Sequence, residues 1–213
     1  MRAYAALVLL AIAATALAAT TTIGRFSAGD LSGWEDETFR GKQKTIYTLV
    51  RDGGRTVLRA QSRGSASGLI RREGFDPKER PVLRWSWKVE GTLRNGNERT
   101  KEGDDYPARV YVVFPRGLFW KTKAINYIWA NRLPKGESIP NPFAPKNVMM
   151  VAVESGNGQA GKWVEEERNI VEDYVKFFGE EPPKAGAIAI MTDTDNTGEE
   201  ATAWYGDITL AAK

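Results

Sequence analysis

The sequence contains no cysteine and no histidine, and these two absences exclude several classes of chemistry. Without cysteine there can be no disulfide, no thiol nucleophile and no zinc–thiolate site. Without histidine there can be no Ser-His-Asp triad, no imidazole base and no histidine ligand for a metal. Any reaction would have to use carboxylates, tyrosine, lysine, arginine or a bound hard cation.

Long hydrophobic runs and strong net charge are also lacking. An apolar stretch at residues 5–14 follows Arg2 and precedes the small-x-small motif Ala16-Leu17-Ala18. We therefore expect a signal peptide at residues 1–18, a single domain at residues 19–213, and an exported protein that is periplasmic or secreted. The stretch is too short for a transmembrane segment. The formal net charge of +3 is too balanced for a nucleic-acid partner.

The sequence is rich in short alternating segments separated by turn residues. Leu83, Trp85, Trp87 and Val89, for example, alternate with polar residues in the way typical of a half-buried strand. Strands are predicted at residues 23–26, 44–50, 56–61, 69–72, 83–90, 110–114, 124–130, 148–153, 163–169, 187–192 and 204–210. One short helix is expected at residues 171–178, ended by Gly179. The pattern predicts an all-β sandwich of roughly nine to eleven strands, with a long aromatic loop around residues 115–146.

Residues 103–114 hold the densest group of reactive side chains. Alternation directs the apolar residues of this strand to the core, and Arg109 and Tyr111 to the opposite face. Asp104 and Asp105 come just before the strand. These carboxylates either contact a ligand hydroxyl, hold Arg109 through a charge-assisted pair, or form a solvated acidic turn.

Two other segments contribute candidate ligand-binding residues. Arg84 and Lys88 would extend a basic face around Arg109 and Tyr111 if their two strands are neighbours. Trp129, in the aromatic segment, either presents its ring to a sugar or is buried as a core plug.

Residues 191–198 supply hard oxygen ligands where a strand leaves the sheet. Asp193, Asp195 and Asn196 suit a structural Ca²⁺, although Trp204 stands where an EF-hand loop requires glutamate. The alternatives are a ligand contact or an Asx-rich turn, and no other cofactor is expected. Alternation also predicts that Asp193 and Arg109 share one site. If they are exposed, a ligand explains them; if they are buried together, they form a structural ion pair.

Several segments resemble the family called domain of unknown function 3047, whose members are exported bacterial proteins. They are residues 26–34, 63–69, 103–114, 191–198 and 205–208. The resemblance implies no activity. The Ser32-Gly33-Trp34 start and the closing Tyr-Gly-Asp-Ile also resemble the galactose-binding-like jelly rolls of carbohydrate-binding modules. That similarity implies a jelly-roll fold and a glycan ligand.

Two functions stay open at this point. The first is a periplasmic glycan- or envelope-polysaccharide-binding protein whose basic face takes a sugar with carboxylate or sulfate groups. The second is an enzyme acting on polysaccharide. It would be either a lyase, with Tyr111 as base and Arg109 neutralising a uronate, or a hydrolase using a pair of the aspartates at positions 104, 105 and 193.

Overall fold

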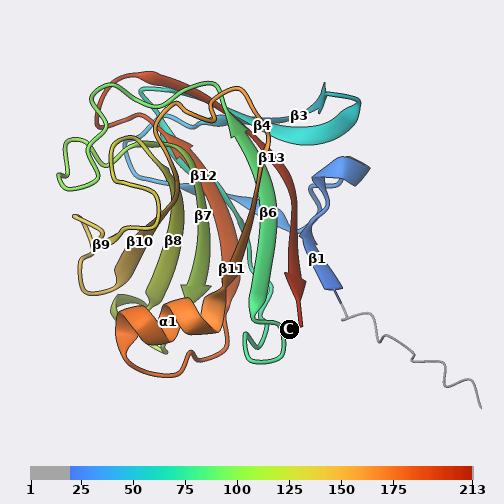
Figure 1. Ribbon diagram of the computed structural model, residues 1–213, viewed down its shortest axis with the longest axis vertical. Helices are drawn as coiled ribbons and strands as arrows, with labels where there is room; N and C mark the ends of the chain where they lie inside the picture. The colour runs from blue at the N-terminus through green and yellow to red at the C-terminus, as the bar shows by residue number, and fades with distance from the viewer. Residues whose placement is uncertain (1–19, 213) are drawn as a thin grey trace, which may run out of the picture.

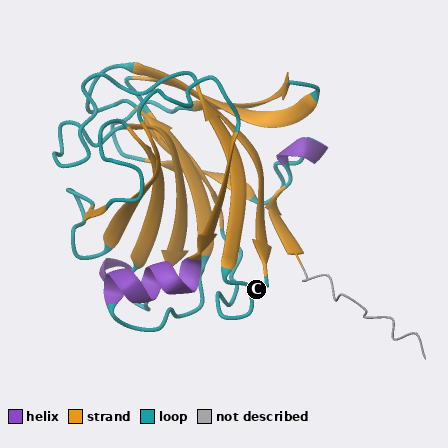
Figure 2. Cartoon of the chain, viewed as in Figure 1, coloured by secondary structure: helices purple, strands orange, loops and turns teal. Residues whose placement is uncertain are grey.

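The computed structural model describes residues 20–212, so the signal peptide predicted at residues 1–18 lies outside the described residues. Two β-sheets pack against each other as a sandwich (Figure 1), which confirms the all-β jelly-roll class. Loops gather at one end of the sandwich and one helix lies across the other end (Figure 2). None of the helices in the described part of the chain has the length and apolar character needed to cross a membrane.

The first sheet has six strands. Its order is β11 (Val164–Asn169), β6 (Val82–Val89), β13 (Glu200–Ala211), β4 (Arg55–Arg63) and β3 (Ile46–Asp52), with β1 (Thr20–Gly24) also paired to β13. The last strand in the sequence therefore lies in the middle of this sheet.

The second sheet has seven strands. Its order is β2 (Trp34–Thr38), β5 (Ala66–Arg71), β12 (Ala187–Asp193), β7 (Tyr106–Phe114), β8 (Lys123–Ala130), β10 (Val148–Ser155) and β9 (Ser138–Pro140). Its strand pairs are antiparallel except β8 and β10, which run parallel. Parallel neighbours cannot be joined by a tight hairpin, so the chain from β8 to β10 makes a long connection that includes β9.

Each predicted strand is present, and two unpredicted strands bring the number among the described residues to 13. The unpredicted β2 is an edge strand of mostly exposed, charged residues, and β9 has only three residues, so neither shows clear alternation. The strand β5 begins at Ala66, in a stretch expected to be a loop. Its small residues allow close strand approach, since a Cβ on Gly68 would lie 2.7 Å from the carbonyl oxygen of Ile190.

The core lies between the two sheets and contains large aromatic rings. Trp87 of β6 packs against Trp129 of β8 with 5.8 Å between ring centroids, and both side chains are fully buried. The indole Nε1 of Trp129 donates to the carbonyl of Gly156 at 3.0 Å. The prediction of Trp129 as a ligand-binding residue is therefore wrong. Alternation along β8 turns this ring inward, where it serves as the core plug.

The helix α1 (Ile170–Phe178) closes one end of the sandwich (Figure 1). It begins at Asn169, whose side chain accepts hydrogen bonds from the amides of Val171 and Glu172. It ends at Gly179, whose φ of 68° lies in the left-handed region, as expected of the predicted glycine cap. Two single turns of 3₁₀ helix, η1 (Phe26–Ala28) and η2 (Phe119–Lys121), complete the regular structure of the described residues.

Candidate binding groove

The outer face of the seven-stranded sheet carries the side chains that alternate with the core residues. On β7 these are Arg109, Tyr111 and Val113, as the sequence predicts. Their neighbours on β12 are, in the same order, Met191, Ala189 and Ala187. The chemistry-bearing face of β7 is thus flanked by small or flexible apolar residues, which leave room above the sheet.

Part of this face is covered by the connection between β8 and β10. Leu133 and Ile139 of that connection pack on Ile128, Met150 and Ala152 in a second, smaller hydrophobic cluster. Because the connection has to return to the start of a parallel strand, it passes over the sheet. The connection does not cover β5 and β12, and a cavity lies over that part of the sheet.

A cavity of ≈ 800 Å³ lies over β5, β7 and β12. Its floor is apolar and is formed by Ile70, Val113, Ala187, Ala189 and Met191. A second cavity of ≈ 430 Å³ adjoins it, and the same side chains of Phe39, Tyr111 and Met191 line both. The two cavities form one depression along the sheet.

A third cavity, of ≈ 550 Å³, continues this depression. It is lined by Trp120 and Phe143, shares Thr122 with the first cavity, and shares Phe143 and Val148 with the second. We call the three connected cavities the outer groove.

Exposed aromatic rings gather at the outer groove. Phe39, Trp120 and Phe143 have relative exposures of 44%, 59% and 56%, and they are the exposed aromatic rings among the described side chains. They come from three separate segments: the chain after β2, η2, and the connection between β9 and β10. Large apolar rings left in water at one place mark a binding surface more often than chance exposure does. Their convergence on one groove therefore points to a ligand.

Arg109 lines the second cavity, and its guanidinium is fully engaged inside the protein. Its Nε donates to Oδ1 of Asp193 at 2.8 Å, and its Nη2 donates to the other oxygen of the same carboxylate. Nη2 also donates to the carbonyl of Asp104 at 2.8 Å, and Nη1 to the hydroxyl of Tyr111 at 3.1 Å. The guanidinium stacks on the ring of Tyr106 at 4.1 Å.

Asp193 and Arg109 thus share one site, as alternation predicts, but they are 2% and 3% exposed. The buried arrangement is the structural ion pair of the two alternatives. Arg109 points away from the core without being free to bind an anion, because the turn before β7 and the turn after β12 close over it. The expectation that Arg109 neutralises an acidic sugar is therefore wrong.

Burial and charge set the ionisation of this cluster. Burial by itself would lower the pKa of Arg109, but Asp193 and Tyr111 raise the pKa well above its usual value, so the guanidinium stays charged. Burial raises the pKa of Asp104, although Arg109 and a hydrogen bond from Asn141 oppose the rise. Burial also raises the pKa of Tyr111 to about 12 despite the nearby guanidinium. Tyr111 is consequently a neutral phenol at physiological pH.

Asp105 holds the turn that follows β12. Its carboxylate accepts hydrogen bonds from the backbone amides of Asn196 and Thr197 at 3.0 and 2.6 Å, and from the side-chain amide of Asn196 at 3.0 Å. Asp105 is fully buried. Asp105 and Asn196 therefore have a structural role, which is to hold the turn after β12 against the start of β7. The solvated acidic turn considered for Asp105 is wrong, because this carboxylate is fully buried.

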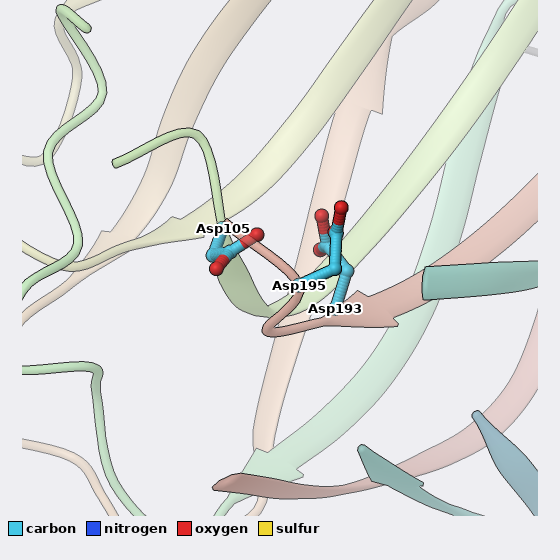
Figure 3. Close-up of side chains that lie close together, drawn as sticks. All are labelled: Asp105, Asp193 and Asp195. Atoms are coloured by element: carbon cyan, nitrogen blue, oxygen red, sulfur yellow. The ribbon is translucent and has the colours of Figure 1, made fainter. Parts of the chain in front are cut away.

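Asp105, Asp193 and Asp195 approach one another at this turn (Figure 3). Each offers a carboxylate oxygen within 4.8 Å of the others. All three nevertheless have partners in the protein, since Asp195 forms an ion pair with Lys42 at 2.5 Å. Hard oxygens at this spacing fit a cation such as Ca²⁺, and the structural calcium stays a prediction. Asp104, Asp195 and Asn196 also line the second cavity.

Arg84 and Lys88 lie on the other sheet, so the basic face predicted around Arg109 does not exist. Their strand, β6, belongs to the six-stranded sheet, and β7 belongs to the seven-stranded sheet. Arg84 forms an exposed ion pair with Glu167 at 2.5 Å. Lys88 pairs with Asp52 at 2.8 Å and lies 4.3 Å from the ring of Trp204. Two strands consecutive in the chain cross between sheets here, which alternation alone cannot reveal.

Sequence analysis missed Phe39, Lys42 and Met191 as groove residues. A large ring at Phe39 beside the Gly41 turn, in a charged stretch, is the one local signal that could have identified it. Met191 is apolar, so its side chain gives no sequence signal for a ligand contact. The groove exists only because segments distant in sequence meet over the sheet.

One family model matches most of the chain: it is described as "Protein of unknown function (DUF3047)" and matches residues 32–209. No curated protein sequence matches the chain.

Solved structures similar to this chain include the family 30 carbohydrate-binding module of a cellulosomal cellulase from Clostridium thermocellum. It has a TM-score of 0.51 at 11% sequence identity, covering 92% of this chain and 98% of that one. A mutant of the family 29 carbohydrate-binding module CBM29-2 gives 0.41 at 15% identity, with 92% and 86% covered. A lectin from Bauhinia forficata in complex with GalNAc gives 0.42 at 9% identity, with 92% and 99% covered. The first similarity supports the sandwich fold.

Proposed function

Because the chain belongs to the DUF3047 family, whose description states no activity, its function has to be argued from the site, and we propose that it binds a glycan in the outer groove. The observation that carries the proposal is the gathering of exposed aromatic rings at that groove. Phe39, Trp120 and Phe143 present flat apolar faces from three segments. A pyranose has one apolar face of similar size, and amphipathic rings suit it.

The proposal takes a neutral polysaccharide as the ligand. The basic side chains that could have bound an acidic sugar are either on the other sheet, as Arg84 and Lys88 are, or paired inside the protein, as Arg109 is. One exposed lysine, Lys146, lines the third cavity. The other cations of the groove have partners: Lys42 pairs with Asp195, and Arg72 pairs with Glu35 and Glu37. An anionic ligand would have to displace these carboxylates.

Binding without catalysis fits the cluster better than an enzyme does. A lyase base must lose its proton near neutral pH, whereas the pKa of Tyr111 is raised to about 12. A hydrolase needs two carboxyl groups that reach the substrate, whereas Asp105 and Asp193 are buried and fully hydrogen-bonded within the protein. The proposal also takes the carbohydrate-binding class from the similarly folded family 30 module. It places the protein outside the cytoplasm, periplasmic or secreted, on the strength of the predicted signal peptide.

The test is affinity electrophoresis of the purified chain in gels that contain soluble neutral polysaccharides, for example xylan, galactomannan, hydroxyethyl-cellulose and starch. At least one of them should retard the wild-type chain. Trp120→Ala and Phe143→Ala should each weaken that binding by about 1–2 kcal/mol, which is roughly five- to thirtyfold, because each removes one stacking face.

The matched control is Ile46→Ala, which removes an apolar side chain of 61% exposure from the other sheet. Its binding should equal that of the wild type. Retardation that is unchanged in both aromatic variants, or no retardation by any polysaccharide in the panel, would refute the proposed function.

A further inference from the structure

Asn126 of β8 has a side chain that the fold leaves without polar partners. It is fully buried, and neither its Oδ1 nor its Nδ2 has a hydrogen-bond partner. Within the described part of the chain, it is the one buried side chain whose donor and acceptor atoms are both unpaired. Native proteins pair about nine-tenths or more of their buried polar groups. A leucine of similar size would fill the space without that cost, so an asparagine here needs a reason beyond folding.

The register places Asn126 beside the floor of the outer groove. Ile125 and Tyr127 belong to the core between the sheets, so the side chain between them points to the outer face. Its direct neighbours there are Tyr111 on β7 and Met150 on β10. Tyr111 lines both the ≈ 800 Å³ and the ≈ 430 Å³ cavity.

Other buried asparagines near this face differ from Asn126 in being paired. Asn131 accepts from the amide of Leu93 and donates to the carbonyl of Asp105, each at 2.8 Å. Asn141 donates to the carboxylate of Asp104 at 3.0 Å and accepts from the amide of Phe143 at 3.0 Å. In these two asparagines, which stabilise the fold, both the amide oxygen and the amide nitrogen form hydrogen bonds. Asn126 has the same chemistry beside the groove with both ends unused.

We propose that Asn126 is a specificity-determining residue of the outer groove, whose amide binds a hydroxyl of the neutral saccharide once the adjoining Tyr111 side chain shifts aside. The inference rests on the proposed function. An amide offers a donor and an acceptor side by side, which matches the pair of roles that a sugar hydroxyl plays. A buried amide left unpaired also discriminates strongly against any ligand that lacks the matching hydroxyl.

The first test is Asn126→Leu, measured by calorimetric titration with the polysaccharide that retards the wild-type chain most. We expect an equal or higher melting temperature together with an affinity about tenfold weaker or more. The control is Ile128→Val, a small apolar change on the same face of β8, which should keep the wild-type affinity. Wild-type affinity in the Asn126→Leu variant overturns the inference and leaves the proposed function standing.

A second measurement covers the case in which the leucine variant fails to fold. The side-chain amide resonances of Asn126 are followed by ¹⁵N-correlated NMR while the same polysaccharide is added to the wild-type chain. They should shift on binding, while those of Asn131 stay in place. Unchanged Asn126 resonances at saturation overturn the inference. If no polysaccharide binds at all, the proposed function fails first and this inference fails with it.

Discussion

At the scale of the residue, Arg109 shows that a side chain directed away from the core can still be buried. Alternation correctly turns its side chain away from the core, but the chain folds back over it and leaves 3% of it exposed. A guanidinium removed from water is tolerated only where its donors are met, and Asp193, Tyr111 and the carbonyl of Asp104 meet them. Its role is to hold two turns together.

This role has a consequence for stability. We expect Arg109→Ala to lower the free energy of unfolding by about 3–5 kcal/mol, because Asp193 stays buried without its cation. A double-mutant cycle of Arg109→Gln and Asp193→Asn, followed by urea denaturation, should give a coupling energy above about 1 kcal/mol. Arg84→Ala is the control, since its pair with Glu167 is exposed and contributes about 0–1 kcal/mol. Equal stability of the two arginine variants would show that the buried pair is not structural.

At the scale of the element, the sequence predicts the strands well where one face is buried. The strands β6 and β7 each have one complete apolar face, and their periodicity is plain. Edge strands lose that signal because neither of their faces is fully covered, as in β2. Sheet membership carries no local signal at all, which is why Arg84 was assigned to the wrong surface. The groove could not be predicted from the sequence for the same reason, because it is formed by contacts between segments distant in sequence.

The spacing of β5 and β12 gives a prediction at this scale. Gly68→Ala would place a Cβ 2.7 Å from the carbonyl oxygen of Ile190, in backbone that cannot move without parting the strands. We expect the change to destabilise the protein by about 1–3 kcal/mol, as overpacking does. Gly158→Ala is the matched control, since nothing lies within 4 Å of its Cβ position. Thermal unfolding of both variants decides the matter, and a Gly68→Ala melting temperature equal to that of Gly158→Ala would contradict the close approach.

At the scale of the whole molecule, Glu166 makes stability depend on pH. It lies on β11, where its carboxylate accepts from the indole of Trp87 at 3.3 Å. Burial raises its pKa to about 7 in spite of the nearby Lys135. The ordinary value of 4.5 applies in the unfolded chain. Between these two values the folded protein holds a proton that the unfolded chain releases, so the free energy of unfolding falls as the pH rises from about 4.5 to about 7.

Glu166→Gln removes this contribution. At pH 8 we expect the variant to be more stable than the wild type by about 1–3 kcal/mol, because a neutral amide replaces a carboxylate that burial disfavours. Near pH 4 the two proteins should be almost equally stable. Urea denaturation at intervals of pH measures the difference. A stability difference that does not change across this window would show that Glu166 keeps its ordinary pKa in the folded protein.

The central place of β13 has a consequence for how the chain is made. Its residues, Glu200–Ala211, join β6 on one side to β4 on the other, and they also pair with β1. Until they have left the ribosome, the six-stranded sheet consists of two separate strand pairs and a lone strand. The native six-stranded sheet therefore cannot form until β13 has been synthesised.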